Sequence, residues 1–326
     1  MDSYPAGNRS GVKRSQFLRL LGAGVMAGAA RAAPSREPGG PVLSIGILTD
    51  CQYVDADTPP NSKRLYRKSP EKLAAAIDHL NAMGDLDFML HLGDSVDREV
   101  KSYDVVMPVF AKAAVPLYQV AGNHDYSIAA ELKEKVPHLL GMKAPHYSLS
   151  QRGWRFVMLD GNQLSLFSSP QGSPGWQTAS AFSKSSKRKL AEYSGGLGEE
   201  QIAWLKTELG KARAAGERVV LVCHYPLLPI DGHSLWDAEA VLDVLKADKD
   251  LIAAWWNGHN HDGNYAAKHG IHFLNFRGMV ETAENSYARV DIYPDRMEVT
   301  GYGREPRRVL RFPAEDFPKQ RNVEKQ

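Results

Sequence analysis

The stretch Val115-Pro116-Leu117-Tyr118-Gln119-Val120-Ala121-Gly122-Asn123-His124-Asp125 places three polar side chains at the end of an apolar run. The run 115–121 is typical of a buried strand. Gly122 then opens a turn, and the three residues after it can bind a cation or move a proton. Open α/β sheets place their sites at the carboxyl ends of strands, but Gly and Asn are also ordinary turn residues. The other strand ends of the chain decide between these two interpretations.

Four more apolar runs, at 42–48, 86–92, 218–223 and 251–256, each read as a core strand and end in residues of the same kind. The side chains that follow these runs are, in chain order, Asp50, Gln52, Asp94, His224, His259 and His261. Chance explains one or two such strand ends. Five of them indicate a metal site at one edge of the fold.

The remaining segments predict how the strands are connected. Ser69 as N-cap and Pro70 at the first helical position predict a helix that Gly84 ends. We expect further helices at 102–113, 127–139 and 199–214, a hairpin over 146–160, and three short strands at 271–276, 287–292 and 297–302. Strands that alternate with helices and are followed by a run of strands predict an α/β sandwich with at least one mixed sheet.

Residues 1–32 have the order of a secretory signal peptide. Basic residues precede a small, apolar run at 20–30, and Ala30-Arg31-Ala32 resembles a cleavage site. Lys13-Arg14 resembles a twin-arginine export signal with Lys in place of the first Arg. We therefore expect export to a bacterial periplasm or the extracellular space. The apolar run is too short to leave a permanent membrane span.

The rest of the chain divides into four predicted parts, and no linker interrupts the alternation of elements after Pro41. They are a Pro/Gly-rich spacer at 33–41, one domain at 42–312, a Ser-, Gly- and Pro-rich surface insertion within it at about 161–195, and a polar tail at 313–326. The insertion carries a basic cluster, Lys184 with Lys187-Arg188-Lys189, that reads as a solvated face.

Composition excludes several classes of protein. The chain has 326 residues, 43% hydrophobic and 24% charged, which is a globular balance. Cys51 and Cys223 are its only cysteines, so a disulfide framework is excluded. Residues 1–32 carry a net charge of +4 and the whole chain +2, so the remainder carries about −2. A nearly neutral domain argues against binding of nucleic acid through electrostatics. Nothing in the sequence indicates the oligomeric state.

The predicted ligands are oxygen and imidazole groups without a thiolate, a set that suits Mn, Fe or Zn. Counted with Asn123, they are seven, too many for one tetrahedral ion. Two divalent ions about 3.5–4 Å apart, sharing one carboxylate, would use all of them. Such a pair clamps a phosphate and activates water for in-line attack.

In this order, five motifs resemble the calcineurin-like metallophosphoesterases: Asp50-Cys51-Gln52, Gly93-Asp94-Ser95-Val96-Asp97, Gly122-Asn123-His124-Asp125, His224-Tyr225-Pro226 and Gly258-His259-Asn260-His261. The resemblance implies a four-layer α-β-β-α sandwich with two mixed sheets. It implies that Asp94 bridges two metal ions, one also bound by Asp50, Gln52 and His261. The other ion would be bound by Asn123, His224 and His259. His124 would act on the phosphoryl group, with Asp125 orienting its ring.

Gln52 narrows the resemblance, because the wider family has His at this position. Gln at this position resembles the Mn-dependent ADP-ribose/CDP-alcohol diphosphatase branch of the family. The stretches 64–69, 193–205 and 261–282 resemble the same branch. The branch implies two Mn²⁺ ions and a small nucleotide diphosphate as substrate. Arg64 and Arg67 would then pair with its second phosphate, and Tyr66, Tyr53 or Trp236 would stack on its base or sugar.

Two alternatives stay open. The first is an exported phosphodiesterase or phosphomonoesterase of broader specificity, which the export signal favours because ADP-ribose is mostly an intracellular metabolite. The second is a non-enzymatic module that binds nucleotide or metal, for which Gln52 is the single hint.

Overall fold

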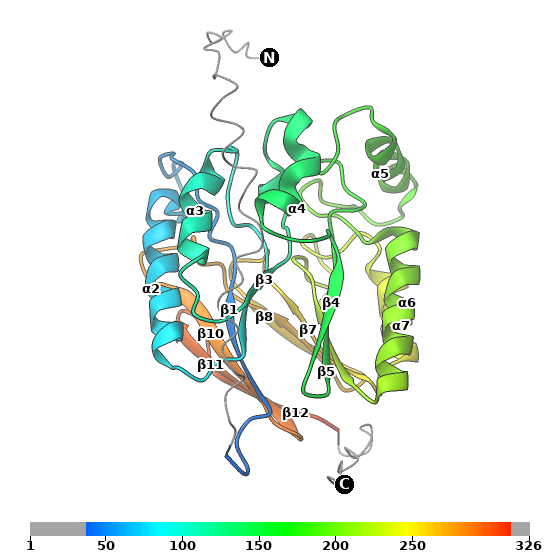
Figure 1. The fold of residues 1–326 in the computed structure, drawn as a ribbon. Helices are drawn as coiled ribbons and strands as arrows, with labels where there is room; N and C mark the ends of the chain where they lie inside the picture. The colour runs from blue at the N-terminus through cyan, green and yellow to red at the C-terminus, as the bar shows by residue number, and fades with distance from the viewer. Residues whose placement is uncertain (1–36, 314–326) are drawn as a thin grey trace.

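The computed structural model describes residues 37–313, which form two six-stranded sheets packed face to face with helices on both outer sides (Figure 1). One sheet has the order β12-β11-β10-β1-β2-β3 and the other β4-β5-β6-β7-β9-β8. Both combine parallel and antiparallel neighbours. The expected four-layer sandwich with two mixed sheets is confirmed. The predicted signal peptide lies outside the described residues, as do residues 33–36 of the spacer and residues 314–326 of the tail.

The first sheet is built around three parallel strands that end in predicted site residues. These are β1 (Leu43–Leu48), β2 (Phe88–His91) and β3 (Leu117–Gln119). The antiparallel strands β10 (Ser286–Ile292), β11 (Arg296–Gly303) and β12 (Arg308–Arg311) extend the sheet beyond β1. Helices α2 (Ser69–Ala82) and α3 (Ser102–Phe110) cover its outer face (Figure 1).

The second sheet repeats this plan. Strands β5 (Trp154–Met158), β6 (Arg218–Val222), β7 (Ile252–Asn257) and β9 (Ile271–Asn275) are parallel. The hairpin strand β4 (Tyr147–Gln151) and β8 (Asn264–Lys268) form its antiparallel edges. Helices α6 (Gly198–Ala215) and α7 (Ala238–Ala247) cover its outer face (Figure 1).

Large aromatic side chains fill the space between the two sheets. Phe88 of β2 meets Phe156 of β5 edge to face, with ring centroids 5.1 Å apart, and Trp256 of β7 packs beside Phe156. Each ring buries about 150–250 Å², so this layer contributes a large part of the apolar stabilisation. The rigid core fixes the carboxyl ends of the strands relative to one another.

Several local predictions were wrong. The helix expected at 127–139 is a 3₁₀ segment, η4 (Ala130–Lys135), followed by one turn, α4 (Val136–Leu139). Pro137 in that turn has no N–H and would clash with a preceding carbonyl in a continuous α-helix. Ser69 is the first residue of α2 and not its N-cap, because the turn η2 (Tyr66–Lys68) runs directly into the helix. The sequence also did not indicate α7, β8 or β12.

The insertion at 161–195 is more ordered than its composition suggested. It contains α5 (Pro174–Ser185), whose Phe182 stacks on Trp236. Arg188, expected on a solvated face, donates hydrogen bonds to the carbonyl oxygens of Leu235 and Trp236 at 2.6 and 3.0 Å. The insertion is therefore fastened to the loop after β6.

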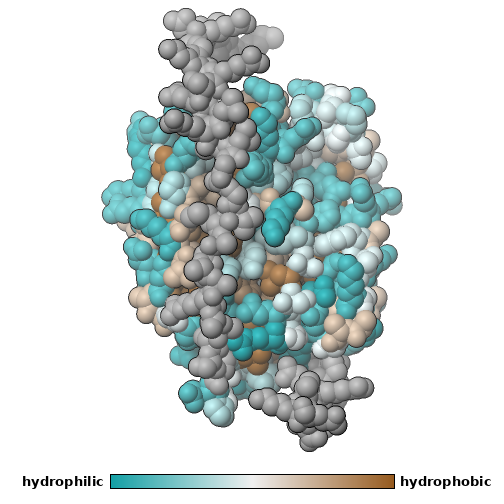
Figure 2. Space-filling view, viewed as in Figure 1, coloured by the Kyte–Doolittle hydropathy of each residue, from teal (hydrophilic) through white to brown (hydrophobic). Residues whose placement is uncertain are grey.

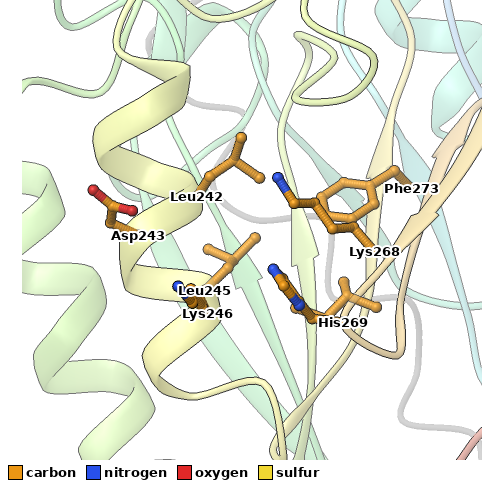
Figure 3. A pocket seen from close by; sticks show the side chains of 8 residues that line it. Leu242, Asp243, Leu245, Lys246, Lys268, His269 and Phe273 are labelled. Carbon is orange, nitrogen blue, oxygen red and sulfur yellow. The ribbon is translucent and has the colours of Figure 1, made fainter.

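One face of the molecule can be seen in the space-filling view (Figure 2). The face in view is mostly hydrophilic, with small hydrophobic spots (Figure 2). A cavity of about 150 Å³ lies between α7 and the β8–β9 hairpin, with Leu242, Lys246, Lys268 and His269 in its wall (Figure 3). None of the predicted site residues lines it. Among the helices of residues 37–313, none is both long enough and apolar enough to cross a membrane.

Candidate metal centre

All seven predicted ligands follow the carboxyl ends of parallel strands, three strands from the first sheet and two from the second. Two sets of three have ligand atoms within 4.8 Å of one another: Asp94 with His224 and His259, and Asp50 with Asp94 and His261. Asp94 belongs to both sets. The two amides, Gln52 and Asn123, are also buried, at 1% and 7% exposure. The sandwich thus brings both sheets to one buried cluster.

The backbone turns sharply at these strand ends. Asp50, Gln52, Asp94 and His259 have φ angles of +53°, +46°, +58° and +70°. This left-handed conformation is uncommon for residues other than glycine and costs on the order of 1–3 kcal/mol each. Surrounding contacts must hold it, and such strain concentrates at ligand-binding sites.

Two glycines allow the cluster to close. A Cβ atom on Gly122 would lie 2.1 Å from Oδ1 of Asp94, and one on Gly258 would lie 2.4 Å from Oδ2 of Asp50. Both distances are far below van der Waals contact. Glycine is therefore required at the turns after β3 and β7, because the carboxylates lie directly against the backbone.

Hydrogen bonds fix Asp50 and Asp94, the two carboxylates of these sets. Thr49 donates its hydroxyl to Asp50 Oδ2 at 2.6 Å, and the amide of His259 approaches the same oxygen at 3.2 Å. Asp94 Oδ1 accepts the amide of His124 at 2.9 Å, and its Oδ2 accepts Nε2 of Gln52 at 3.0 Å. Both carboxylates are fully buried.

Two histidines have one ring nitrogen anchored and the other directed at a carboxylate. Nδ1 of His224 donates to the carbonyl of Leu92 at 2.8 Å, so Nε2 faces Asp94 Oδ2 at 3.2 Å. Nδ1 of His261 donates to Glu281 Oε1 at 2.8 Å, so Nε2 faces Asp50 Oδ1 at 3.2 Å. Because Leu92 and Glu281 accept hydrogen bonds from Nδ1, Nε2 is the nitrogen of each ring that could bind a metal ion. Metal-binding histidines commonly have this arrangement.

Two buried amide oxygens have no hydrogen-bond partner within the described residues: Oε1 of Gln52 and Oδ1 of Asn123. Buried polar atoms are nearly always paired, so two unpaired amide oxygens on residues of this cluster call for a missing partner. The amide of Gln52 would present Oε1 to that partner after a flip, since its Nε2 now lies 3.0 Å from Asp94 Oδ2 and 2.9 Å from Nε2 of His261. A hard or borderline divalent cation supplies such a partner to carboxylate, amide and imidazole groups alike. The residues present therefore fit the two divalent ions that the sequence predicted.

Comparison with known proteins decides the family. Residues 43–263 match the calcineurin-like phosphoesterase family. The chain belongs to this family. The phosphoesterase is accordingly a metal-dependent phosphohydrolase, as the motif order predicted.

Individual relatives carry the branch name that Gln52 suggested. The mouse manganese-dependent ADP-ribose/CDP-alcohol diphosphatase is 28% identical over 85% of this chain and 95% of its own length. The Arabidopsis thaliana protein of the same name is 27% identical over 81% and 95%. Among solved structures, a dimetal phosphatase from Danio rerio superposes with a TM-score of 0.74 at 24% identity, over 84% of this chain and all of that one. That match confirms the fold of the phosphoesterase.

The electrostatics of the phosphoesterase site are dominated by Asp50 and Asp94. Burial opposes ionisation of both, but His261 outweighs it at Asp50 and His224 with His124 at Asp94, so both pKa values are lowered. Burial likewise opposes protonation of His224, yet Asp94 raises its pKa to about 9. Protons on imidazoles thus balance two buried carboxylates, a role that divalent cations take over when they bind.

The proposed orienting partner of His124 was wrong. Nδ1 of His124 lies 2.8 Å from Oδ1 of Asp97, and the carboxylate of Asp125 does not contact the ring. Asp125 instead accepts backbone N–H groups at about 2.9 Å from Asp94, Ser95 and Gly122. A residue adjacent in sequence points away at this turn, whereas the GDxxD motif loop brings Asp97 alongside the ring.

Of the three residues predicted to bind substrate, the structure places one at the site and two away from it. Arg64 lies at the site, where its Nε donates to Glu281 Oε1 at 3.3 Å. Arg67 pairs instead with Asp55 and Asp57, since that acidic loop folds back over it. Tyr66 is only 5% exposed and lies beneath the guanidinium of Arg98, so its ring has no open face for stacking.

Sequence reasoning missed the exposed ring beside the site. Tyr193 is 48% exposed, and its centroid lies 5.7 Å from those of both His233 and His259. Trp236, one of the rings expected to stack on substrate, is buried against Phe182. Tyr193 stands at the end of the Ser- and Gly-rich insertion, where no periodicity marks it. The resemblance of the stretch 193–205 to the diphosphatase branch is the one available signal.

Proposed function

We propose that this phosphoesterase hydrolyses the phosphoanhydride bond of small nucleotide diphosphates, such as ADP-ribose and CDP-alcohols, with the aid of two Mn²⁺ ions. The observation that carries the proposal is the membership of Asp94 in both ligand sets, since a shared carboxylate is what a two-ion centre requires. Manganese and the substrate class are supported by the names of the relatives.

The ligand assignment follows the two sets. Asp50, Gln52, Asp94 and His261 would hold one ion, and Asp94, Asn123, His224 and His259 the other. Bound there, two divalent ions would neutralise phosphate charge and supply activated water at neutral pH. The amide oxygen of Gln52, in place of an imidazole, favours Mn²⁺, although Fe and Zn also accept this donor set.

His124 is the proposed catalytic acid. Asp97 holds its Nδ1, which leaves Nε2 as the ring nitrogen that can serve a substrate. Burial opposes protonation of the ring, but Asp94 and the hydrogen bond to Asp97 outweigh it and raise the pKa of His124. A protonated His124 would transfer its Nε2 proton to the leaving oxygen as the P–O bond breaks.

Two side chains support a substrate with two phosphates and a ring. Arg64 would bind a second phosphate through the guanidinium N–H groups that Glu281 and Tyr66 do not take. Tyr193 offers an exposed aromatic face beside His259 for a base or sugar. A phosphomonoester would need neither contact.

A substrate panel in Mn²⁺ tests the substrate class. We expect kcat/KM for ADP-ribose and CDP-choline to exceed that for bis(p-nitrophenyl) phosphate and p-nitrophenyl phosphate by at least tenfold. Faster turnover of the diester would instead support the alternative of a broader phosphodiesterase. Asp94→Asn serves as the inactive control, and its full activity would argue against the two-ion centre itself.

We also propose that the protein is exported, on the signal pattern of residues 1–32. The chain fused to a reporter that is active only outside the cytoplasm should give signal in a bacterial host. Loss of that signal on Arg14→Ala together with Lys13→Ala would assign the twin-arginine route. Absence of reporter signal from a fusion protein that is expressed would contradict export.

A further inference from the structure

We propose that Glu281 is a positioning residue that aligns the ring of His261 and the guanidinium of Arg64 with a single carboxylate oxygen. Oε1 of Glu281 accepts Nδ1 of His261 at 2.8 Å and Nε of Arg64 at 3.3 Å. The inference rests on the proposed function, in which His261 binds an ion and Arg64 binds the second phosphate. The further step is that one residue, Glu281, positions both the metal ligand His261 and the phosphate ligand Arg64.

The contact with His261 decides which ring nitrogen faces the metal centre. With Nδ1 hydrogen-bonded to Glu281, the ring directs Nε2 at Oδ1 of Asp50, so Nε2 is the nitrogen left for an ion. A carboxylate in this place also makes the imidazole more basic and restricts its rotation. The His261 side chain is 8% exposed and that of Glu281 17%, so water competes little for the hydrogen bond.

The contact with Arg64 restrains a long side chain whose other hydrogen-bond partner is Tyr66. Arg64 is partly exposed, at 32%, and an unrestrained Arg loses rotamer entropy when it binds a ligand. Held through Nε, its guanidinium stays close enough for its charge to act on His124 and His261. Glu281 thus holds the guanidinium of Arg64 in position before the substrate binds.

The backbone around Glu281 is itself rigidly held. Residues 63–65 and 280–282 pair as a short antiparallel bridge, with Leu65 N to Val280 O at 2.8 Å and Thr282 N to Lys63 O at 2.9 Å. The buried ammonium of Lys72 donates to three carbonyls of the same segment, those of Met279, Glu281 and Thr282. These hydrogen bonds from Lys72 anchor the segment 279–282 to α2. The carboxylate of Glu281 therefore has little freedom to move.

Metal titration of the full chain, stripped of metal and without any substrate, tests the link to His261. We expect Glu281→Gln to weaken binding of one of two Mn²⁺ ions by about 10–100-fold in calorimetry. Glu281→Asp keeps the charge but shortens the reach, and should weaken the same ion. Glu284→Gln, which removes an exposed charge from the same loop, is the matched control and should stay within twofold of wild type.

Affinity within twofold of wild type in both folded Glu281 variants would overturn the inference. Because no substrate is present, this result is independent of whether the substrate panel supports ADP-ribose. Folding of each variant is checked by thermal unfolding, and Glu281→Asp decides the matter if Glu281→Gln does not fold.

A double-mutant cycle tests the link to Arg64, using whichever phosphoester of the panel is hydrolysed fastest. Arg64→Ala should raise KM at least tenfold in the wild-type background. In the Glu281→Gln background it should raise KM less than threefold, since Arg64 has already lost its support. Equal increases in the two backgrounds would show that Glu281 does not position Arg64.

Discussion

Nδ1 of His124 lies 2.8 Å from Oδ1 of Asp97, and this pair forms the imidazole–carboxylate dyad of the site. The dyad spans two strand ends, because Asp97 follows β2 and His124 follows β3. The neighbouring carboxylate, Asp125, is fully buried and serves the backbone instead. The two acids therefore have different functions, and their variants should behave differently.

Replacement of Asp97 should impair catalysis more than folding. Asp97→Asn removes the charge that favours protonated His124, so we expect kcat to fall about 10²–10⁴-fold. Manganese content should not change, because Asp97 belongs to neither ligand set. Steady-state kinetics together with metal analysis check both statements. If Asp97→Asn stays active, or loses its metal, the His124–Asp97 pair does not act as the catalytic acid.

Replacement of Asp125 should impair folding first. Its two oxygens accept four backbone N–H groups, and an Asn side chain keeps one acceptor oxygen and turns a donor toward the others. We expect Asp125→Asn to lower the free energy of unfolding by about 2–4 kcal/mol, measured by denaturant titration. Unchanged stability with a selective loss of kcat would restore Asp125 to the catalytic role first assigned to it.

The identity of residue 52 should set the choice of metal. Gln52→His restores the imidazole found in the wider family, and imidazole suits Zn²⁺ and Fe better than an amide oxygen does. We expect the ratio of Mn²⁺ to Zn²⁺ affinity to fall at least tenfold in competition binding. The same ratio in variant and wild type would mean that Gln52 does not bind the ion.

A buried acid behind the site should make stability depend on pH. Burial of Asp160 outweighs the hydrogen bonds from Asn162 and raises its pKa to about 6. The folded chain therefore binds this proton more tightly than the unfolded chain, and it loses stability as pH rises from about 4 to 6. Asp160→Asn removes this loss.

The measurement is the difference in unfolding free energy between Asp160→Asn and wild type at two pH values. From pH 4 to pH 8 we expect it to shift by about 2–3 kcal/mol in favour of the variant. The comparison cancels the titration of all other groups. A difference that does not vary with pH would show that Asp160 titrates normally.

Much of the fold and of the ligand cluster was predictable because apolar runs reveal buried strands and their ends. The ends of β1, β2, β3, β6 and β7 could be read directly, and parallel packing then brought Asp50, Asp94 and His224 together. The resemblance supplied the division into two ion sites. Gln52, a residue that breaks the wider pattern, pointed to the branch that the relatives share.

What sequence could not supply depends on contacts between distant segments or on exposed residues without periodicity. The partner of His124 is decided by how the turn after β2 folds over β3, and adjacency in sequence pointed to the wrong acid. Arg67 resembled a phosphate ligand until the loop carrying Asp55 was seen to cover it. Tyr193 begins a stretch that resembled the branch, but no periodicity marks its ring, and its place beside His259 is seen only in the structure.

The number of Mn²⁺ ions bound per chain tests the central claim most directly. Metal-free protein should take up two ions at saturation, and Asp94→Asn should lose tight binding of both, because Asp94 belongs to both sets. A wild-type chain that binds a single ion, or an Asp94→Asn variant that still binds two tightly, would contradict a two-ion centre bridged by Asp94.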